Sequence, residues 1–520
     1  MDNQARTTDG EVIEVTLTDP PFSSFDFVEA HFGGLRSVRR LFSQARSLGM
    51  RSIVVEAIAP VGLVAIENEE IAKFYDDYSM GDLRRISFWS VPLSNIADVK
   101  SAPPNALLGY AILKEDKIPN LSLDSWHVFE AVIQKSELPY IYIPCGKRFN
   151  IRVCDQELSV PGVIYCQQNG LNKACAQVAL RSLCSLHIPD SEVSFSAINE
   201  AAESATGAFD PNQGLDVSQM RAVLDRFGIR YTDIDYTTLS AEERDALTYQ
   251  KFLYAGIESG AGSLLGFKLT GPNASGRHII PFFGHTFNRD TWVPKADSAY
   301  FHVGEDTRYV PSESWLASFV GHDDNFGSNY CIPRLYITPE QAQYVVSLYR
   351  KDVHYSGVEA EAIAINFLYS MRRYIIATGP GWLRRLLNYI DTQEIVLRAI
   401  SLTKSEYVSH LRTMHDWSEA QEIALICEAI ELSLPSNLWM VELSVPELFP
   451  ANLRKVGEIL LNSGIVPEPD HDIATYIFAR LPSRYLLFNG TAADGTPKFT
   501  IVPSGLTSHT PLFSEDCRGV

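Results

Sequence analysis

Cys175 is the residue of this chain best suited to covalent chemistry, provided that one of the twelve histidines partners it. A thiolate can attack a carbonyl carbon, and an imidazole can hold the proton of the thiol and return it to a leaving group. Cys175 follows a polar turn around Asn169-Gly170 and precedes an apolar run, so we predict that it lies in the first turn of a buried helix. The side chain of Asn172 is suited to cap that helix.

The surroundings of Cys175 favour a reactive thiolate. The positive end of a helix dipole stabilises negative charge in the first turn. Gln167 and Gln168 lie just upstream, after a strand predicted over residues 163–166, and a side-chain amide there can donate a hydrogen bond to a developing oxyanion. The alternative interpretation is that Cys175 is structural, because cysteines are often buried in apolar helices.

Residues 162–187, with the sequence GVIYCQQNGLNKACAQVALRSLCSLH, resemble the nucleophile region of the papain-like cysteine peptidases. The likeness is greatest to the branch that cleaves bacteriocin leader peptides. Gln168 is one residue further from Cys175 than in the family pattern, and Ala176 stands where the family has a glycine. The resemblance implies that Cys175 is the nucleophile and that Gln168 helps to stabilise the oxyanion.

Two later segments extend the resemblance to about residue 300. Residues 214–229, GLDVSQMRAVLDRFGI, predict a helix that Asp216 and Gln219 begin with a capping box, and such a helix packs beside the central helix in the leader-peptidase branch. Residues 277–287, RHIIPFFGHTF, predict a strand that follows a turn. Papain-like enzymes carry their catalytic histidine at the start of such a strand.

Two histidines compete for this role, His278 and His285. They are seven residues apart, an odd number, so a regular strand points them to opposite faces of its sheet. The family pattern places the histidine six residues before a glycine, a spacing that His278 and Gly284 share. The resemblance therefore implies that His278 partners Cys175, and His285 is interpreted as a polar residue near the tip of a hairpin.

A third catalytic member, which would orient the imidazole, is predicted from strand register. If Asn288-Arg289 is a two-residue hairpin loop, Phe287 pairs with Asp290 and His278 lies opposite Ala299. Asp297 is then a diagonal neighbour of His278 on the same face. We therefore predict Asp297 as the third member, with Asp290 and Asn288 as the alternatives.

Composition and charge narrow the class of protein. The 520 residues carry a net charge of −19, which argues against binding to nucleic acid or to an anionic membrane and favours a basic partner. No apolar run is long enough for a membrane span, and the first residues do not form a secretory signal. The eight cysteines include no CxxC pair, and the twelve histidines show no zinc-ligand spacing. We expect a reduced, cytoplasmic protein without metal or cofactor.

The chain is expected to fold as three parts of the α+β class. Residues 1–150 predict a mixed α/β region, and residues 151–335 a papain-like domain made of a helical half and an antiparallel sheet. Residues 336–520 predict a mainly helical region with a few strands. Helices are predicted there over residues 339–349, 358–377, 382–389, 392–401, 405–414, 418–432 and 446–462, and strands over 439–443, 485–488 and 498–502.

These features predict a thiol hydrolase that cleaves a peptide or isopeptide bond through an acyl-enzyme, with a protein or peptide as substrate. The same residues can also run deamidation or acyl transfer, because the acceptor that reaches the acyl-enzyme decides the product. A papain-like fold without catalysis, used as a binding or sensor module, is the alternative of another class. The two flanking regions are candidates for binding a protein partner.

Overall fold

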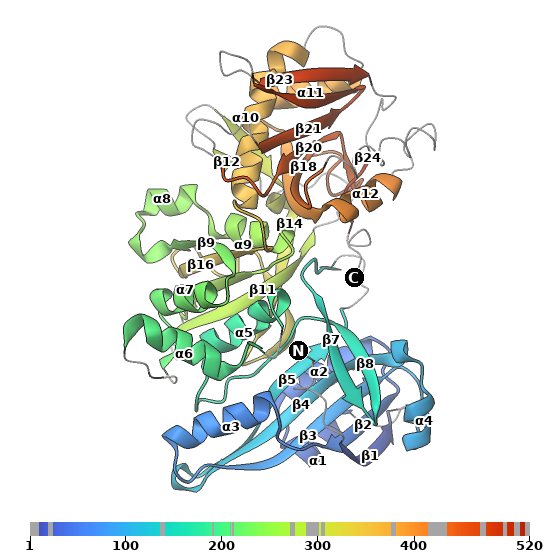
Figure 1. Ribbon diagram of the computed structural model, residues 1–520, viewed down its shortest axis with the longest axis vertical. Helices are drawn as coiled ribbons and strands as arrows, with labels where there is room; N and C mark the ends of the chain where they lie inside the picture. Colours follow the sequence, from blue (N-terminus) through green and yellow to red (C-terminus); the bar gives the residue numbers. More distant parts are fainter. Residues whose placement is uncertain are drawn as a thin grey trace.

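Three large β-sheets, each covered by helices, follow one another along the long axis of the molecule (Figure 1). They also follow the order of the chain, except that the strands at residues 301–302 and 308–311 belong to the third sheet and precede the last strands of the second. The structure is a computed structural model, and it describes residues 10–18, 24–135, 141–189, 192–207, 210, 213–270, 276–287, 301–302, 307–375, 381–413, 434–467, 475–491, 497–503 and 510–514. Helices and mostly antiparallel strands occur in all three parts, as expected for the α+β class. Within these residues, no helix is long and apolar enough to cross a membrane.

The first sheet is an antiparallel meander of five strands in chain order. Ile53 and Val55 pack on one face with the first two helices, whereas Val54 points to the opposite face and packs with α3. This alternation within one strand buries both faces of the sheet. The elements are β1 (Glu11–Leu17), α1 (Ser24–Phe32), α2 (Arg36–Ser47), β2 (Ser52–Ala57), α3 (Leu63–Phe74), β3 (Ser79–Trp89), α4 (Ile96–Ser101), β4 (Leu107–Ile118) and β5 (Leu123–Ile133).

A β-hairpin connects the first sheet to the second. It consists of β7 (Lys147–Val153) and β8 (Gln156–Gly162). The turn is formed by Cys154 and Asp155, which both have positive φ, at 49° and 66°. Two-residue turns of this kind usually carry asparagine or glycine, so Cys-Asp gave no turn signal.

The second sheet has the strand order β15-β14-β11-β10-β16-β9, with neighbours antiparallel and the short β6 (Ile141–Tyr142) added to β11. Helix α5 packs on the face of β11 that carries Ile279 and Phe283, and α9 packs on the face that carries Ile280 and Phe282. The elements are α5 (Cys175–His187), α6 (Phe195–Thr206), α7 (Val217–Arg226), β9 (Arg230–Asp235), α8 (Ala241–Ala246), α9 (Tyr249–Glu258), β10 (Ser263–Lys268), β11 (Arg277–Phe287), β14 (Leu316–Asp323), β15 (Gly327–Pro333) and β16 (Ala342–Tyr349).

Phe287 pairs with Leu316 of β14, and the hairpin loop predicted at Asn288-Arg289 lies outside the described residues. One prediction about this sheet is wrong. Residues 342–349, predicted as part of a helix, form β16 between β10 and β9. The second sheet therefore continues beyond the predicted boundary at residue 335.

The third sheet has eight strands, in the order β12-β13-β17-β18-β20-β21-β22-β23. Helices α10 and α11 pack on one face, and α12 packs on the other. Only β13 and β17 run parallel. The elements are β12 (Phe301–His302), β13 (Arg308–Pro311), α10 (Gly357–Ile375), α11 (Gly381–Asp391), β17 (Val396–Thr403), α12 (Lys404–Thr413), β18 (Asn437–Ser444), β19 (Arg454–Lys455), β20 (Gly457–Asn462), β21 (Tyr476–Leu481), β22 (Arg484–Thr491), β23 (Pro497–Pro503) and β24 (Thr510–Pro511), and β19 pairs with β24 outside the sheet.

The prediction of a mainly helical C-terminal region is wrong for the described residues. Residues 396–401 and 457–462, predicted as parts of helices, lie in β17 and β20. Both strands are buried along nearly their whole length, because helices cover both faces of the sheet. Such a strand lacks the alternation of polar and apolar residues that identifies a half-exposed strand, and it resembles a piece of buried helix. The helix predicted over 418–432 lies outside the described residues.

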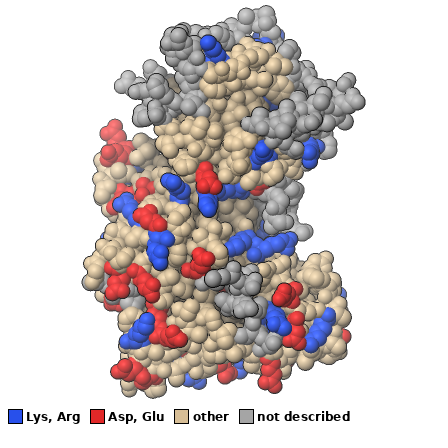
Figure 2. Space-filling view, in the orientation of Figure 1, with Lys and Arg blue, Asp and Glu red and all other residues tan. Residues whose placement is uncertain are grey.

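A chain of buried charges joins the second part of the molecule to the third. Glu258 of α9 accepts hydrogen bonds from Arg398 of β17 at 3.0 and 3.2 Å, and Arg398 also contacts Glu442 at 3.2 Å. Lys455 continues the chain, with its Nζ 2.7 Å from both Glu442 and Glu458. All five side chains are buried. By contrast, acidic and basic side chains lie interspersed on the middle and lower parts of the face seen in Figure 2.

We predict that Arg398→Met destabilises the protein by about 3 kcal/mol, because removing one member of a buried ion pair leaves uncompensated charge. The cost should lie at the lower end of the usual range, since Glu258 and Glu442 each keep another partner, His285 and Lys455. Denaturant unfolding measures the change. Lys100→Met is the control, because its pair with Asp155 is half exposed and worth at most about 1 kcal/mol. Equal losses in the two variants would contradict the prediction.

Candidate active site

Cys175 is the first residue of α5. The residues that follow it, from Ala176 to Ser185, are all buried, whereas Cys175 itself is partly exposed. The helix and the place of Cys175 in its first turn are as predicted. The cap is not: Ala174 precedes the helix, and its backbone N–H donates to Oε1 of Gln177 at 3.2 Å. Asn172 is fully buried and donates instead to Glu70 at 2.6 Å.

His278 is the second residue of β11 and lies close enough to Cys175 for this thiol to raise the pKa of its imidazole. Its side chain is buried, and the ring of Phe267 on the neighbouring strand contacts it edge-on, with centroids 5.7 Å apart. Helix α5 packs directly on β11, which brings the start of the helix to the start of the strand. The structure thus brings together the two residues that the sequence selected.

Two carboxylates face the other side of the imidazole. Nε2 of His278 lies 3.5 Å from Oδ2 of Asp323 and 3.4 Å from Oδ1 of Asp324. Asp323 is the last residue of β14, and its Oδ1 accepts the backbone N–H groups of Asn325 and Phe326 at 2.9 and 3.1 Å. These two bonds hold the carboxylate so that its second oxygen points to His278.

The electrostatics of the group favour a charged imidazole. Burial lowers the pKa of His278, but the nearby Asp323, Cys175 and Asp324 outweigh it and raise the pKa to about 10. Burial raises the pKa of Asp324 to about 6, against the opposing effect of His278. Because the folded pKa of His278 is the higher one, its ion pairs stabilise the fold fully below about pH 6.5 and lose this effect as the pH rises through about 10.

The third catalytic member predicted from the sequence, Asp297, lies outside the described residues, as do Asp290 and Asn288. The hairpin loop on which the register of Asp297 depended also lies outside the described residues, and β14 pairs with β11 at residues 282–287. Asp323 and Asp324 were missed because a long segment separates them from β11 in the sequence. Their one signal is an acidic pair that follows residues 316–321 after one intervening residue, His322.

Gln168 lies beside the turn that carries Asp323. Its Nε2 donates to Oδ1 of Asn325 at 2.9 Å. The neighbouring Gln167 is held elsewhere, because its Oε1 accepts the hydroxyl of Ser37 at 2.9 Å and the backbone N–H of Val128 at 3.2 Å. The role of Gln168 as an oxyanion donor stays a prediction.

His285 is separated from the site, as its odd spacing from His278 predicted. It is fully buried, and its Nε2 lies 2.5 Å from Oε1 of Glu258 on α9. Its ring packs among Tyr142, Tyr254 and Phe287. The interpretation of His285 as a polar residue at a hairpin tip is therefore wrong: it is a core residue that ends the buried chain of charges.

A cavity of about 750 Å³ opens beside the pair, and both Cys175 and His278 line it. Its size is typical of a ligand-binding cleft. The start of α7 forms one wall, and Phe267 and Tyr344 from the central sheet form another. Its charged lining residues are Asp210, Asp216, Asp235 and Arg277.

His278, Asp323 and Asp324 are also the one group among the described residues that could hold a metal ion, since their donor atoms lie within 4.8 Å of one another. One nitrogen and two carboxylates can bind a divalent metal. Because the two carboxylates also raise the pKa of His278, a proton on the imidazole would compete with such a metal.

Comparison of the chain with protein-family models, with curated proteins and with solved structures finds no match.

We predict that His278 keeps its proton to about pH 10 and that Asp323→Asn moves this titration to lower pH by about 1–3 units, since an opposite charge favours the charged form of the imidazole. Histidine resonances in NMR spectra report it directly. His322 is the internal control, because burial lowers its pKa to about 3 and keeps it neutral. A wild-type His278 that titrates near its ordinary value would refute the assignment.

Proposed function

We propose that this protein is a cysteine hydrolase that cleaves an amide bond of a peptide or protein. The observation that carries the proposal is the grouping at His278: it lines the same cavity as Cys175, and its Nε2 lies 3.5 Å from Oδ2 of Asp323. Nucleophile, base and orienting acid in this order are the arrangement that acyl transfer needs. The cavity at Cys175 gives a substrate access to the thiol.

The reaction divides into two steps. The thiolate of Cys175 attacks the carbonyl carbon, and the imidazolium of His278 gives its proton to the leaving amine as the C–N bond breaks. His278 then takes a proton from water, whose oxygen attacks the thioester, and the thiolate of Cys175 leaves as the acid product forms. Asp323 keeps the ring oriented and compensates its charge in both steps.

The oxyanion of each step needs hydrogen-bond donors. The backbone N–H of Cys175 is one of the first amides of α5, which have no partner within the helix. Gln168 is the second proposed donor, and its contact with Asn325 keeps it near the acid side of the site. Donors of this kind lower the barrier by several kcal/mol in comparable enzymes, about 3–4 kcal/mol for one donor.

A papain-like arrangement is part of the proposal. A buried helix that begins with the cysteine, packed on an antiparallel sheet whose strand begins with the histidine, supports it. The acid departs from the sequence expectation, because it comes from β14 after a long insertion. The same residues can run deamidation or acyl transfer to an amine, and which acceptor reaches the thioester decides between these products.

We predict that a peptidyl epoxide or vinyl sulfone labels Cys175 alone and that Cys175→Ala abolishes both labelling and hydrolysis. Alanine fits the same helix position, so the variant should stay folded. Cys184→Ala is the matched control on the same helix, because Cys184 is fully buried and burial raises its pKa to about 12. Labelling is read by mass spectrometry of the digested protein.

Three results would count against the hydrolase. Unlabelled folded wild-type protein would favour a binding module, and unchanged turnover in Cys175→Ala would mean that another residue is the nucleophile. Activity that EDTA abolishes and a divalent ion restores would favour a metal held by His278 and the two aspartates. We expect activity to be insensitive to EDTA.

We also predict a preference for basic side chains near the cleaved bond. Three aspartates and one arginine line the cavity, so its field attracts cations. Fluorogenic peptides with lysine or arginine should be cleaved about tenfold faster than matched glutamate peptides, and the ratio should fall as salt screens the field. Equal rates at low salt would contradict the preference.

A further inference from the structure

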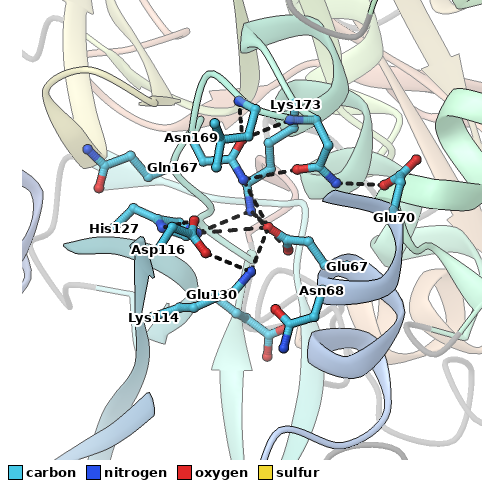
Figure 3. Close-up of polar contacts among 12 residues, drawn as sticks. Glu67, Asn68, Glu70, Lys114, Asp116, His127, Glu130, Gln167, Asn169 and Lys173 are labelled. Atoms are coloured by element: carbon cyan, nitrogen blue, oxygen red, sulfur yellow. Dashed lines mark hydrogen bonds and ion pairs between the residues drawn. The ribbon is translucent and has the colours of Figure 1, made fainter. Parts of the chain in front are cut away.

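The segment that leads into Cys175 is bonded to the first part of the molecule through almost every polar side chain it carries. Figure 3 shows Asn169 and Lys173 of this segment pointing into a group of charged residues from α3, β4 and β5. No substrate reaches this group, because Lys173, Glu67 and His127 are buried. Any effect of this group on the site must therefore act through the position of neighbouring residues and not through contact with a substrate.

Lys173 makes the strongest of these contacts. Its Nζ lies 2.9 and 3.2 Å from the two carboxylate oxygens of Glu67 on α3, and 3.4 Å from Nε2 of His127 on β5. Lys173 and Glu67 have essentially no exposed surface. A lysine amine buried in this way keeps its charge only beside a carboxylate, so Lys173 cannot leave Glu67 without a large penalty.

The group is balanced in charge. Lys114 lies 3.5 Å from Glu67 and 3.0 Å from Asp116, and Asp116 lies 3.2 Å from Nδ1 of His127. Burial of Glu67 raises the pKa of its carboxyl group, but the charges of Lys114 and Lys173 outweigh this effect and lower the pKa to about 2. Burial and Lys173 lower the pKa of His127 to about 4, so the ring is neutral at pH 7. Two lysines thus face two carboxylates around a neutral imidazole.

Asparagines extend the contact along the segment. Nδ2 of Asn169 donates to Glu67 at 3.1 Å, and its Oδ1 accepts the backbone N–H groups of Leu171 and Asn172 at 2.9 and 3.2 Å. Asn172 donates to Glu70, and its backbone oxygen accepts from Asn199 of α6 at 2.8 Å. With Gln167 bonded to Ser37, the segment is held at both of its ends.

We propose that Lys173 and Glu67 are positioning residues for Cys175. Through this ion pair, the first part of the molecule helps to set the geometry of the active site. The inference rests on the proposed function. Lys173 precedes the nucleophile by two residues. The ion pair with Glu67 therefore fixes the position at which α5 begins and the position of Cys175 relative to His278. A displacement of about 1 Å at a reacting group costs about a hundredfold in rate.

The test compares two variants, each of which removes one equally buried basic side chain. Lys173→Met breaks the ion pair with Glu67, and Arg85→Met breaks the ion pair of Arg85 with Glu56, which is as deeply buried and lies 2.7 Å apart in the same part of the molecule. Denaturant unfolding of both variants shows whether they lose similar stability. The rate of alkylation of Cys175 by iodoacetamide, measured across pH, reports the reactivity of the thiol. Separate values of kcat and KM report its effect on turnover and on substrate binding.

Lys173→Met should lower kcat about 10- to 100-fold with KM little changed, and should slow alkylation of Cys175 at neutral pH. Arg85→Met should keep the wild-type alkylation profile. Asn169→Ala should shift the profile in the same direction as Lys173→Met but less, because it removes hydrogen bonds to Glu67 and to the segment without leaving a charge unpaired. It decides the matter if Lys173→Met does not fold.

Reactive wild-type Cys175 with unchanged profiles in Lys173→Met and Asn169→Ala would overturn the inference and leave the hydrolase standing. Equal loss of reactivity in Lys173→Met and Arg85→Met would also overturn it, since the effect would then follow stability alone. A wild-type Cys175 with the reactivity of a free thiol would remove the hydrolase and the inference together.

Discussion

A charged imidazole inside a protein needs opposite charge within a few ångströms, and this requirement organises the site around His278. The ring is buried beside the carboxylates of Asp323 and Asp324, and Cys175 also raises its pKa. Without these groups, burial would lower the pKa of the imidazole and favour its neutral form. The start of α5, the start of β11 and the end of β14 must therefore meet at one point, and the rest of the second sheet serves to hold them there.

Buried ion pairs recur wherever two parts of this molecule meet. Glu67 with Lys173 joins the first part to the nucleophile segment, and Glu258 with Arg398 joins the second part to the third. Such pairs add little net stability compared with apolar contacts, but they are costly to break. They tolerate few alternative arrangements, so they fix the relative position of neighbouring elements more narrowly than an apolar surface does. An enzyme that assembles its site from distant segments needs that kind of fixation.

The sequence predicted those features whose causes are local. Cys175 in the first helical turn and the capping box of Asp216 with Gln219 are confirmed, because each depends on a few neighbouring residues. The pairing of β11 with β14 was not predictable, because a long stretch of sequence separates the two strands. The positions of Asp323 and Asp324 beside His278 were missed for the same reason. Strands β17 and β20 were read as helix because burial on both faces removes the alternation that marks a strand. Asn172 was predicted to cap the helix, but its side chain donates a hydrogen bond to Glu70, a residue outside the segment.

The division of the chain at residue 150 illustrates how packing overrides sequence order. Val54 and Leu63 of the first part and Leu180 and Leu183 of α5 belong to one continuous apolar core. Helix α5 thus shares its core with residues that precede it by more than a hundred positions. Opening of the first sheet would expose part of this core, so the stability of the first part is coupled to that of the helix that carries Cys175. The buried contacts of Lys173 and Asn169 with Glu67 join the same two regions through polar groups.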